Sequence, residues 1–182
     1  MKIRNPLVQS LLILMFHSSA FAIELICEKT PDFKLRNLNG EYEFLENVIS
    51  SIDGIAVMSI FQTTCEPCIE EINFLKELKK KNQDSKSGSF IFFLVSSRED
   101  VNVVSDFVRS NNLSSERVLL DKSGKLDSQF QIKLIPKMIF LDKKRRIISA
   151  IEGKELGDLR VSNKLGKIIA DYSAVNPCDK KR

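Results

Sequence analysis

The sequence of 182 residues is poor in residues that several functions require: it has one histidine, two tyrosines and no tryptophan. No segment interleaves basic with aromatic residues, and the formal net charge is only +4, so we expect no nucleic-acid partner. Internal repeats and low-complexity tracts are also absent. With 43% hydrophobic and 29% charged residues, the composition is that of a globular protein with an apolar core.

The N-terminal 22 residues have the features of a secretory signal peptide. A short positively charged segment precedes the nearly continuous apolar residues 7–16, and a small-x-small sequence ends at Ala22. The apolar segment is shorter than the about 20 residues that span a bilayer. The sequence therefore predicts export with cleavage after Ala22, a single domain over residues 23–175 and a basic tail over residues 176–182.

Cleavage at that point would also remove His17, the only imidazole of the chain. The mature chain then offers no His-based catalytic dyad and no His-containing metal site. All four cysteines remain, namely Cys27, Cys65, Cys68 and Cys178. An even number of cysteines in an exported chain allows disulfide bonds, and we expect neither a metal nor a cofactor.

Apolar patterning predicts alternating strands and helices. Continuous apolar segments at 55–61 and 90–95 are typical of buried strands, and helical spacing of apolar residues marks 65–81 and 101–108. The order of elements implies an α/β fold with a mixed central sheet, helices on both faces and an N-terminal β-hairpin. The other expected elements are strands over 33–38, 42–44, 118–120, 138–141 and 147–151, and helices over 45–52, 126–130 and 159–172.

A Cys-Glu-Pro-Cys motif at residues 65–68 stands between a predicted buried strand and an amphipathic helix. Two intervening residues in a first helical turn bring both sulfurs within bonding distance. The N–H groups and dipole of the helix end stabilise a thiolate, so Cys65 is the expected nucleophile and Cys68 the resolving thiol. Pro67 suits the first turn because its missing N–H costs nothing there.

A zinc site and a purely structural disulfide are the other uses of such a pair. Zinc needs a second pair of ligands at fixed spacing, but only Cys27 and Cys178, near opposite ends of the mature chain, remain. A structural bond between Cys65 and Cys68 would close too short a loop to constrain the unfolded chain much. We therefore favour thiol–disulfide exchange, in which Cys65 attacks a substrate disulfide and Cys68 resolves the mixed disulfide.

Ile135-Pro136 stands directly before the apolar residues 138–141. Proline lacks an N–H for a sheet ladder, so one interpretation is merely a strand start or a turn. The other is a cis proline that faces the cysteine motif and leaves the backbone of Ile135 free to pair with an extended substrate.

These segments resemble the TlpA/ResA-like branch of thioredoxins, in collinear order over about residues 30–172. The resemblance implies a thioredoxin-like fold with an N-terminal β-hairpin extension. It also implies a periplasmic or membrane-associated reductase, a class that often serves cytochrome c maturation. It also implies protein thiols or disulfides as substrates, an exported or membrane electron donor, and Pro136 as a cis proline. The similar stretches are residues 61–71, 119–126 and 134–142, together with Pro31-Asp-Phe and Leu38-Asn-Gly.

Glu71 matches an acidic residue that this branch carries three positions after the second cysteine. It would tune the cysteine pKa values or move a proton, or else be a solvent-facing helix charge. Ser59 replaces a usual Asn or Asp, which weakens a buried-acid mechanism. Thr64 replaces the usual Trp, and Lys137-Met138 replaces a small hydroxyl pair; we expect both changes on the surface that contacts a substrate.

Glu66 and Pro67, between the cysteines, are expected to tune the redox potential. A carboxylate beside Cys65 opposes the thiolate and raises its pKa. A less stabilised thiolate makes the disulfide less oxidising, so we expect a reductant.

Cys27 and Cys178 are candidates for a structural disulfide. In an oxidising compartment they would tie the N-terminal region to the C-terminal tail, and a bond that closes so long a loop stabilises by several kcal/mol in the chain-entropy model.

Two other functions remain open. A thiol peroxidase needs a threonine three residues before its peroxidatic cysteine, and Gln62 holds that place. A Cu(I)-binding or adaptor module of this fold generally adds a histidine, although two thiolates alone bind Cu(I). We expect a monomer.

Overall fold

The computed structural model describes residues 26–50, 54–83, 89–153, 166–168, 171 and 176–179. The predicted signal peptide and most of the helix predicted over 159–172 lie outside these residues; Gly166, Lys167, Ile168 and Asp171 are helical. Within the described part of the chain, no helix is both long enough and apolar enough to cross a membrane.

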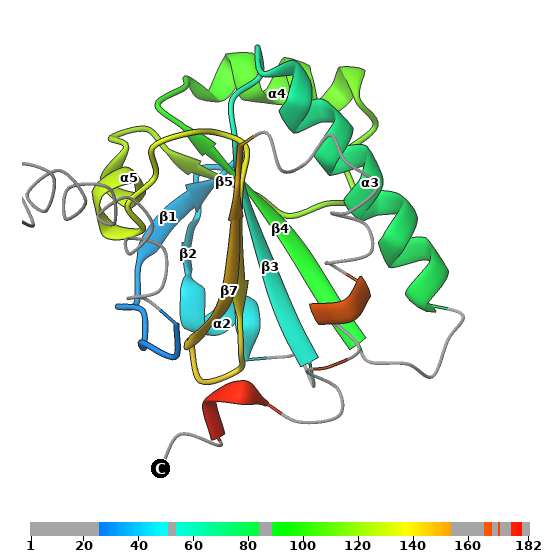
Figure 1. The fold of residues 1–182 in the computed structure, drawn as a ribbon. Helices are drawn as coiled ribbons and strands as arrows, with labels where there is room; N and C mark the ends of the chain where they lie inside the picture. The colour runs from blue at the N-terminus through cyan, green and yellow to red at the C-terminus, as the bar shows by residue number, and fades with distance from the viewer. Residues whose placement is uncertain are drawn as a thin grey trace, which may run out of the picture.

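The described residues form one seven-stranded sheet in the order β2-β1-β5-β4-β3-β6-β7 (Figure 1). Its centre is parallel, with β4 between β3 and β5, and every other pair is antiparallel. The predicted N-terminal hairpin is confirmed and extends the sheet by pairing β1 with β5. The strands are β1 (Lys34–Asn37), β2 (Tyr42–Phe44), β3 (Gly54–Phe61), β4 (Ser89–Ser97), β5 (Val118–Asp121), β6 (Lys137–Leu141) and β7 (Ile147–Glu152).

Helices cover both faces of the sheet, as the sequence predicts (Figure 1). Side chains alternate along β3: Val57 joins the apolar cluster that contains α3 and α4 residues, and Met58 joins the cluster with α2 and α5. The two clusters therefore form two cores, one on each face. The helices are α2 (Leu45–Ile49), α3 (Glu66–Gln83), α4 (Val101–Ser110), α5 (Lys125–Gln129) and the 3-10 turn η2 (Pro177–Asp179).

The central strand β4 is longer than its apolar pattern predicts. It continues through Ser96 and Ser97, which are buried although they are polar. Their hydroxyls donate to Glu99 and Asp127, so burial leaves neither hydroxyl unsatisfied. The carboxyl ends of β3 and β4 meet at one edge of the sheet, because Phe61 pairs with Ser96. This edge carries the cysteine motif.

The N-terminal residues 27–30 and η2 lie at the turn of the β6–β7 hairpin, opposite the sheet edge that carries the cysteine motif. The N–H of Cys27 donates to the carbonyl of Ile147 (2.7 Å), and the N–H of Ile147 donates to the carbonyl of Glu28 (3.0 Å). These bonds cover the start of the edge strand β7 with a short antiparallel segment.

Candidate active site

The cysteine motif joins the end of β3 to the start of α3. The N–H of Cys65 donates to the carbonyl of Gln62 (3.1 Å), which closes the turn before the helix. Cys65 precedes the helix, and its Sγ accepts a bond from the N–H of Cys68 (3.3 Å). That placement gives the sulfur the N–H groups and positive dipole end of α3.

The two cysteines form a disulfide and differ in exposure. Cys65 is half-buried, whereas Cys68 is fully buried and packs in the core between α3 and the sheet. The first sulfur is therefore accessible from outside the molecule and the second is not. Thr64, Glu66 and Pro67 are exposed around Cys65.

The peptide bond between Ile135 and Pro136 is cis. Lys137, the next residue, pairs with Ile60 in the antiparallel β3–β6 ladder. The start of β6 therefore meets the end of β3, so the cis proline lies at the sheet edge that carries Cys65. Ile135 is half-buried and packs against both apolar clusters.

Glu71 is buried, with a relative exposure of 3%, which excludes the solvent-facing interpretation of this residue. The hydroxyl of Ser59 donates to its Oε1, and Oε2 has no hydrogen-bond partner among the described residues. Burial raises the pKa of Glu71 from the ordinary 4.5 to about 8, and the Ser59 bond offsets part of that rise. The sequence contained the signal, because Glu71 lies three residues after the buried Cys68 and four before the buried Leu75.

The expectation that Ser59 weakens a buried-acid arrangement is wrong. The buried acid is Glu71 of α3, and the hydroxyl of Ser59 on β3 donates a hydrogen bond to it.

The expectation that Lys137 and Met138 change the contact surface is also wrong, because both side chains are buried. Lys137 Nζ donates to the carbonyl of Gln131 (3.3 Å) and lies 3.6 Å from Glu152 Oε1. Burial alone would raise the pKa of Glu152, but bonds from the N–H groups of Leu134 and Lys133 and the charge of Lys137 hold it below its ordinary value. The ion pair of Lys137 and Glu152 thus binds the loop that precedes the cis proline.

Glu99 was not found by sequence reasoning. Its carboxylate accepts bonds from the N–H and the hydroxyl of Thr63 (3.0 and 2.6 Å) and from the hydroxyl of Ser96 (2.7 Å). Thr63 and Glu99 are 36 positions apart, in two segments expected to be loops, so no local pattern predicts their contact.

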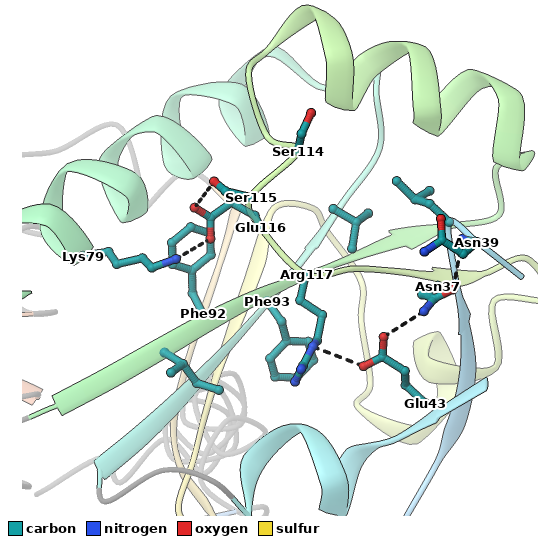
Figure 2. A pocket seen from close by; sticks show the side chains of 13 residues that line it. Asn37, Asn39, Glu43, Lys79, Phe92, Phe93, Ser114, Ser115, Glu116 and Arg117 are labelled. Carbon is teal, nitrogen blue, oxygen red and sulfur yellow. Dashed lines mark hydrogen bonds and ion pairs between the residues drawn. The ribbon is translucent and has the colours of Figure 1, made fainter. Parts of the chain in front are cut away.

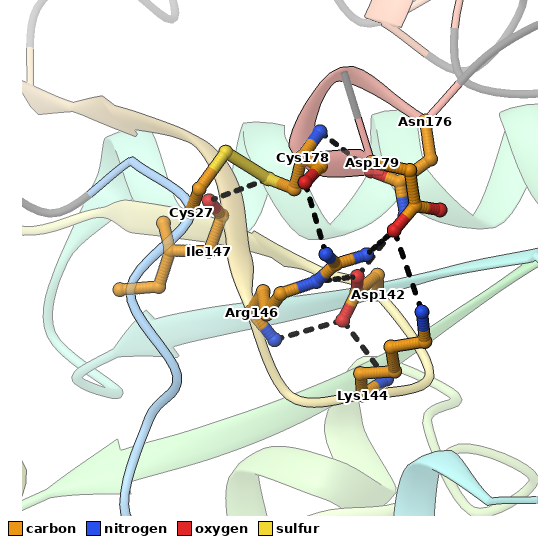
Figure 3. Close-up of polar contacts among 8 residues, drawn as sticks. All are labelled: Cys27, Asp142, Lys144, Arg146, Ile147, Asn176, Cys178 and Asp179. Carbon is orange, nitrogen blue, oxygen red and sulfur yellow. Dashed lines mark hydrogen bonds and ion pairs between the residues drawn. A yellow bond between two sulfur atoms is a disulfide. The ribbon is translucent and has the colours of Figure 1, made fainter. Parts of the chain in front are cut away.

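Cys27 and Cys178 form a second disulfide (Figure 3). Beside it, Arg146 donates to the carbonyl of Cys178 (3.1 Å) and to a carboxylate oxygen of Asp179 (2.7 Å). Asp142, fully buried at the hairpin turn, accepts bonds from the Arg146 side chain (2.6 Å) and from Asn176 (3.1 Å). Residues 176–179 of the predicted tail are therefore packed against the domain.

A surface pocket of about 490 Å³ lies between the β1–β2 hairpin, α3 and the loop before β5 (Figure 2). Lys79 pairs with Glu116 (2.9 Å) and Arg117 with Glu43 (3.2 Å) along its walls. None of the predicted site residues lines it.

Together, the mixed sheet, the cysteine pair before a helix and the cis proline on a neighbouring strand define a thioredoxin-fold protein with a dithiol–disulfide site. The chain belongs to the Redoxin family, whose model matches residues 28–167. A cysteine pair that forms a disulfide at the start of a helix is what thiol–disulfide exchange requires.

Known proteins of related sequence or fold agree with this class. The chain is 25% identical over 117 residues to the thioredoxin-like protein YneN of Bacillus subtilis (strain 168), over 64% of this chain and 65% of YneN, which is less than two thirds of that relative. Its fold is similar to that of the thiol:disulfide interchange protein DsbE from Chlorobium tepidum, with a TM-score of 0.65 and 14% identity over 79% and 97% of the two chains. A secreted disulfide oxidoreductase from Mycobacterium tuberculosis, homologous to E. coli DsbE, gives a TM-score of 0.60 and 18% identity over 76% and 95%.

Proposed function

We propose that the protein reduces disulfides of exported protein substrates through Cys65 and Cys68. The observation that carries this proposal is the unequal exposure of the two sulfurs at the N-terminus of α3. The outer sulfur accepts the N–H of Cys68, a bond that favours its thiolate.

The reaction proceeds in two exchanges. The Cys65 thiolate attacks one sulfur of a substrate disulfide, which forms a mixed disulfide and releases one substrate thiolate. The Cys68 thiolate then attacks Cys65 Sγ, which closes the Cys65–Cys68 bond and releases the second substrate thiolate. The substrate gains two electrons and the protein loses two, so an exported or membrane dithiol donor must reduce the protein again.

Glu71 is proposed to exchange a proton with Cys68. A buried carboxyl with a pKa of about 8 is close to an ordinary thiol, whose pKa is about 8.5, so a proton can pass either way at little cost. The carboxyl lies one helical turn after Cys68, on the buried face of α3. The substrate backbone would pair with Ile135 beside the cis proline, and Thr64 would contact the substrate next to Cys65.

Export is supported by the small-x-small sequence ending at Ala22 and by the secreted protein of similar fold. A periplasmic location and a role in cytochrome c maturation rest on the resemblance of residues 61–71 and 134–142 to the TlpA/ResA-like branch.

The direction of exchange is tested by redox titration of the purified protein, with Cys65 and Cys68 followed by alkylation. We expect a midpoint near or below that of thioredoxin, about −270 mV, because Glu66 disfavours the Cys65 thiolate. Glu66→Gln should make the disulfide more oxidising, and Glu70→Gln, a change at an exposed residue of the same helix, serves as the control. A midpoint near about −120 mV would show an oxidant.

Replacing Glu71 by glutamine keeps the side-chain shape but removes the ionisable carboxyl. We expect the reduction rate to fall by about 10² and the ionisation near pH 8 to vanish from its pH profile, since a positioned acid–base group contributes about that factor or more. Glu70→Gln should leave rate and profile unchanged. A Glu71→Gln profile that still contains the ionisation would assign it to another group.

Glu71→Gln should also change how the stability of the protein depends on pH, in a direction that follows from the raised pKa of Glu71. Because the pKa of Glu71 is raised in the folded state, the stability tied to its neutral form is fully present below pH 4.5 and is lost as the pH rises through about 8. The wild type should therefore lose stability over this range, and Glu71→Gln should lose less, as measured by urea unfolding at several pH values.

A further inference from the structure

We infer that Glu99 is a positioning residue for the exchange reaction: its carboxylate holds the loop that presents Cys65 to a substrate disulfide. The inference rests on the proposed function and concerns a residue that does not touch the reacting sulfurs.

The contacts of Glu99 converge on one residue of that loop. Both carboxylate oxygens accept the N–H of Thr63 (3.0 and 3.1 Å), and Oε1 also accepts its hydroxyl (2.6 Å). Oε2 in turn accepts the hydroxyl of Ser96 (2.7 Å), which fixes the carboxylate to the end of β4. Hydrogen bonds to an ionised acceptor are about twice as strong as neutral ones. Arg98, the neighbouring cation, pairs with Asp127 (2.8 Å) and so points to a different element.

Thr63 lies only two residues before the nucleophile Cys65, so the hydrogen bonds of Glu99 to Thr63 also restrain Cys65. Two residues later, the N–H of Cys65 closes the turn on the carbonyl of Gln62 (3.1 Å), and the Gln62 side chain donates to the carbonyl of Ser97 (3.2 Å). The loop is thus attached at Gln62 to the end of β4 and at Thr63 to Glu99, just after β4. Disulfide exchange needs the attacking sulfur aligned with the bond it breaks, and a misplacement of about 1 Å can cost about 10²-fold in rate.

The loop that precedes the cis proline is held in the same way. Glu152 accepts the N–H groups of Lys133 (2.8 Å) and Leu134 (3.0 Å), just before the cis proline. Each of the two loops that would face a substrate is therefore bound by one carboxylate, which accepts one backbone N–H group in the case of Glu99 and two in the case of Glu152.

The variant Glu99→Ala tests the inference, because it should slow one reaction of Cys65 and leave a second reaction of Cys65 unchanged. We measure kcat and KM for the reduction of insulin disulfides, and the pH profile of alkylation of reduced Cys65 by iodoacetamide, a small probe that needs no aligned loop. Glu99→Ala should lower kcat by at least about tenfold, with the alkylation profile and the thermal midpoint close to wild type. Glu116→Ala, a change in a carboxylate paired with Lys79 elsewhere, should change neither reaction.

A double-mutant cycle shows whether Glu99 acts through Thr63. Thr63→Ala alone should lower kcat less than Glu99→Ala, and the double variant should be no slower than Glu99→Ala, since the two side chains share one interaction. If Glu99→Ala does not fold, Glu99→Gln, which keeps one acceptor oxygen, replaces it and should lower kcat by about threefold or more.

Three results would overturn the inference: unchanged kcat in the Glu99 variant, additive effects in the cycle, or an alkylation profile that shifts as much as kcat, which would make Glu99 a charge that tunes Cys65. A wild-type protein that reduces no disulfide would instead overturn the proposed function. An active wild type with an equally active Glu99 variant would refute the inference alone.

Discussion

Replacing Cys65 by serine is expected to reduce disulfide exchange to the uncatalysed rate. A serine hydroxyl is a poor nucleophile at neutral pH and cannot form the mixed disulfide, and the buried Cys68 cannot reach a protein substrate in its place.

Replacing Cys68 by serine has a different expected result. Cys65 still attacks, but no thiol resolves the product, so the mixed disulfide accumulates and is detectable by mass spectrometry under non-reducing conditions.

The matched control is the double variant Cys27→Ser/Cys178→Ser, which removes the other cysteines and should exchange at the wild-type rate. Mixed disulfides on Cys68 in the Cys65→Ser variant would reverse the assigned roles. Consumption of hydrogen peroxide by the wild type without protein-disulfide reduction would favour a thiol peroxidase, and Cu(I) retention without exchange would favour a binding module.

Removing the Cys27–Cys178 disulfide is expected to cause the largest loss of stability. The bond joins residues 151 positions apart, and in the chain-entropy model a loop of that length contributes about 5 kcal/mol. Urea unfolding of Cys27→Ser/Cys178→Ser in oxidising buffer should therefore show a much lower midpoint than wild type. The ion pair between Arg146 and Asp179 keeps part of the contact between η2 and the hairpin, so the variant should still fold (Figure 3).

The variant Cys65→Ser/Cys68→Ser provides a comparison within the same chain. The disulfide that it removes closes a loop of only three positions and contributes about 2 kcal/mol to stability in the same model. Equal unfolding midpoints for wild type and Cys27→Ser/Cys178→Ser would show that the long-range bond does not form in solution. Since β6 separates the hairpin turn from Pro136, loss of this bond should leave exchange intact.

Local signals in the sequence determined most of the fold and the position of the reactive pair. Apolar runs of strand length predicted β3 and β4, and helical spacing predicted α3, because burial on one or both faces imposes a period that short segments already display. The Cys-Glu-Pro-Cys motif at residues 65–68 was equally readable, since a helix start and two sulfurs at this spacing are properties of adjacent residues.

The tertiary structure alone decided how the reactive pair is supported. Ser59 binds Glu71 across the interface of sheet and helix, Glu99 binds Thr63 between two loops, and the buried Lys137 pairs with Glu152. Each of these contacts joins residues whose separation in the sequence has no fixed relation to their distance in space. They depend on which elements pack together and at what register, which no periodicity within a single segment specifies.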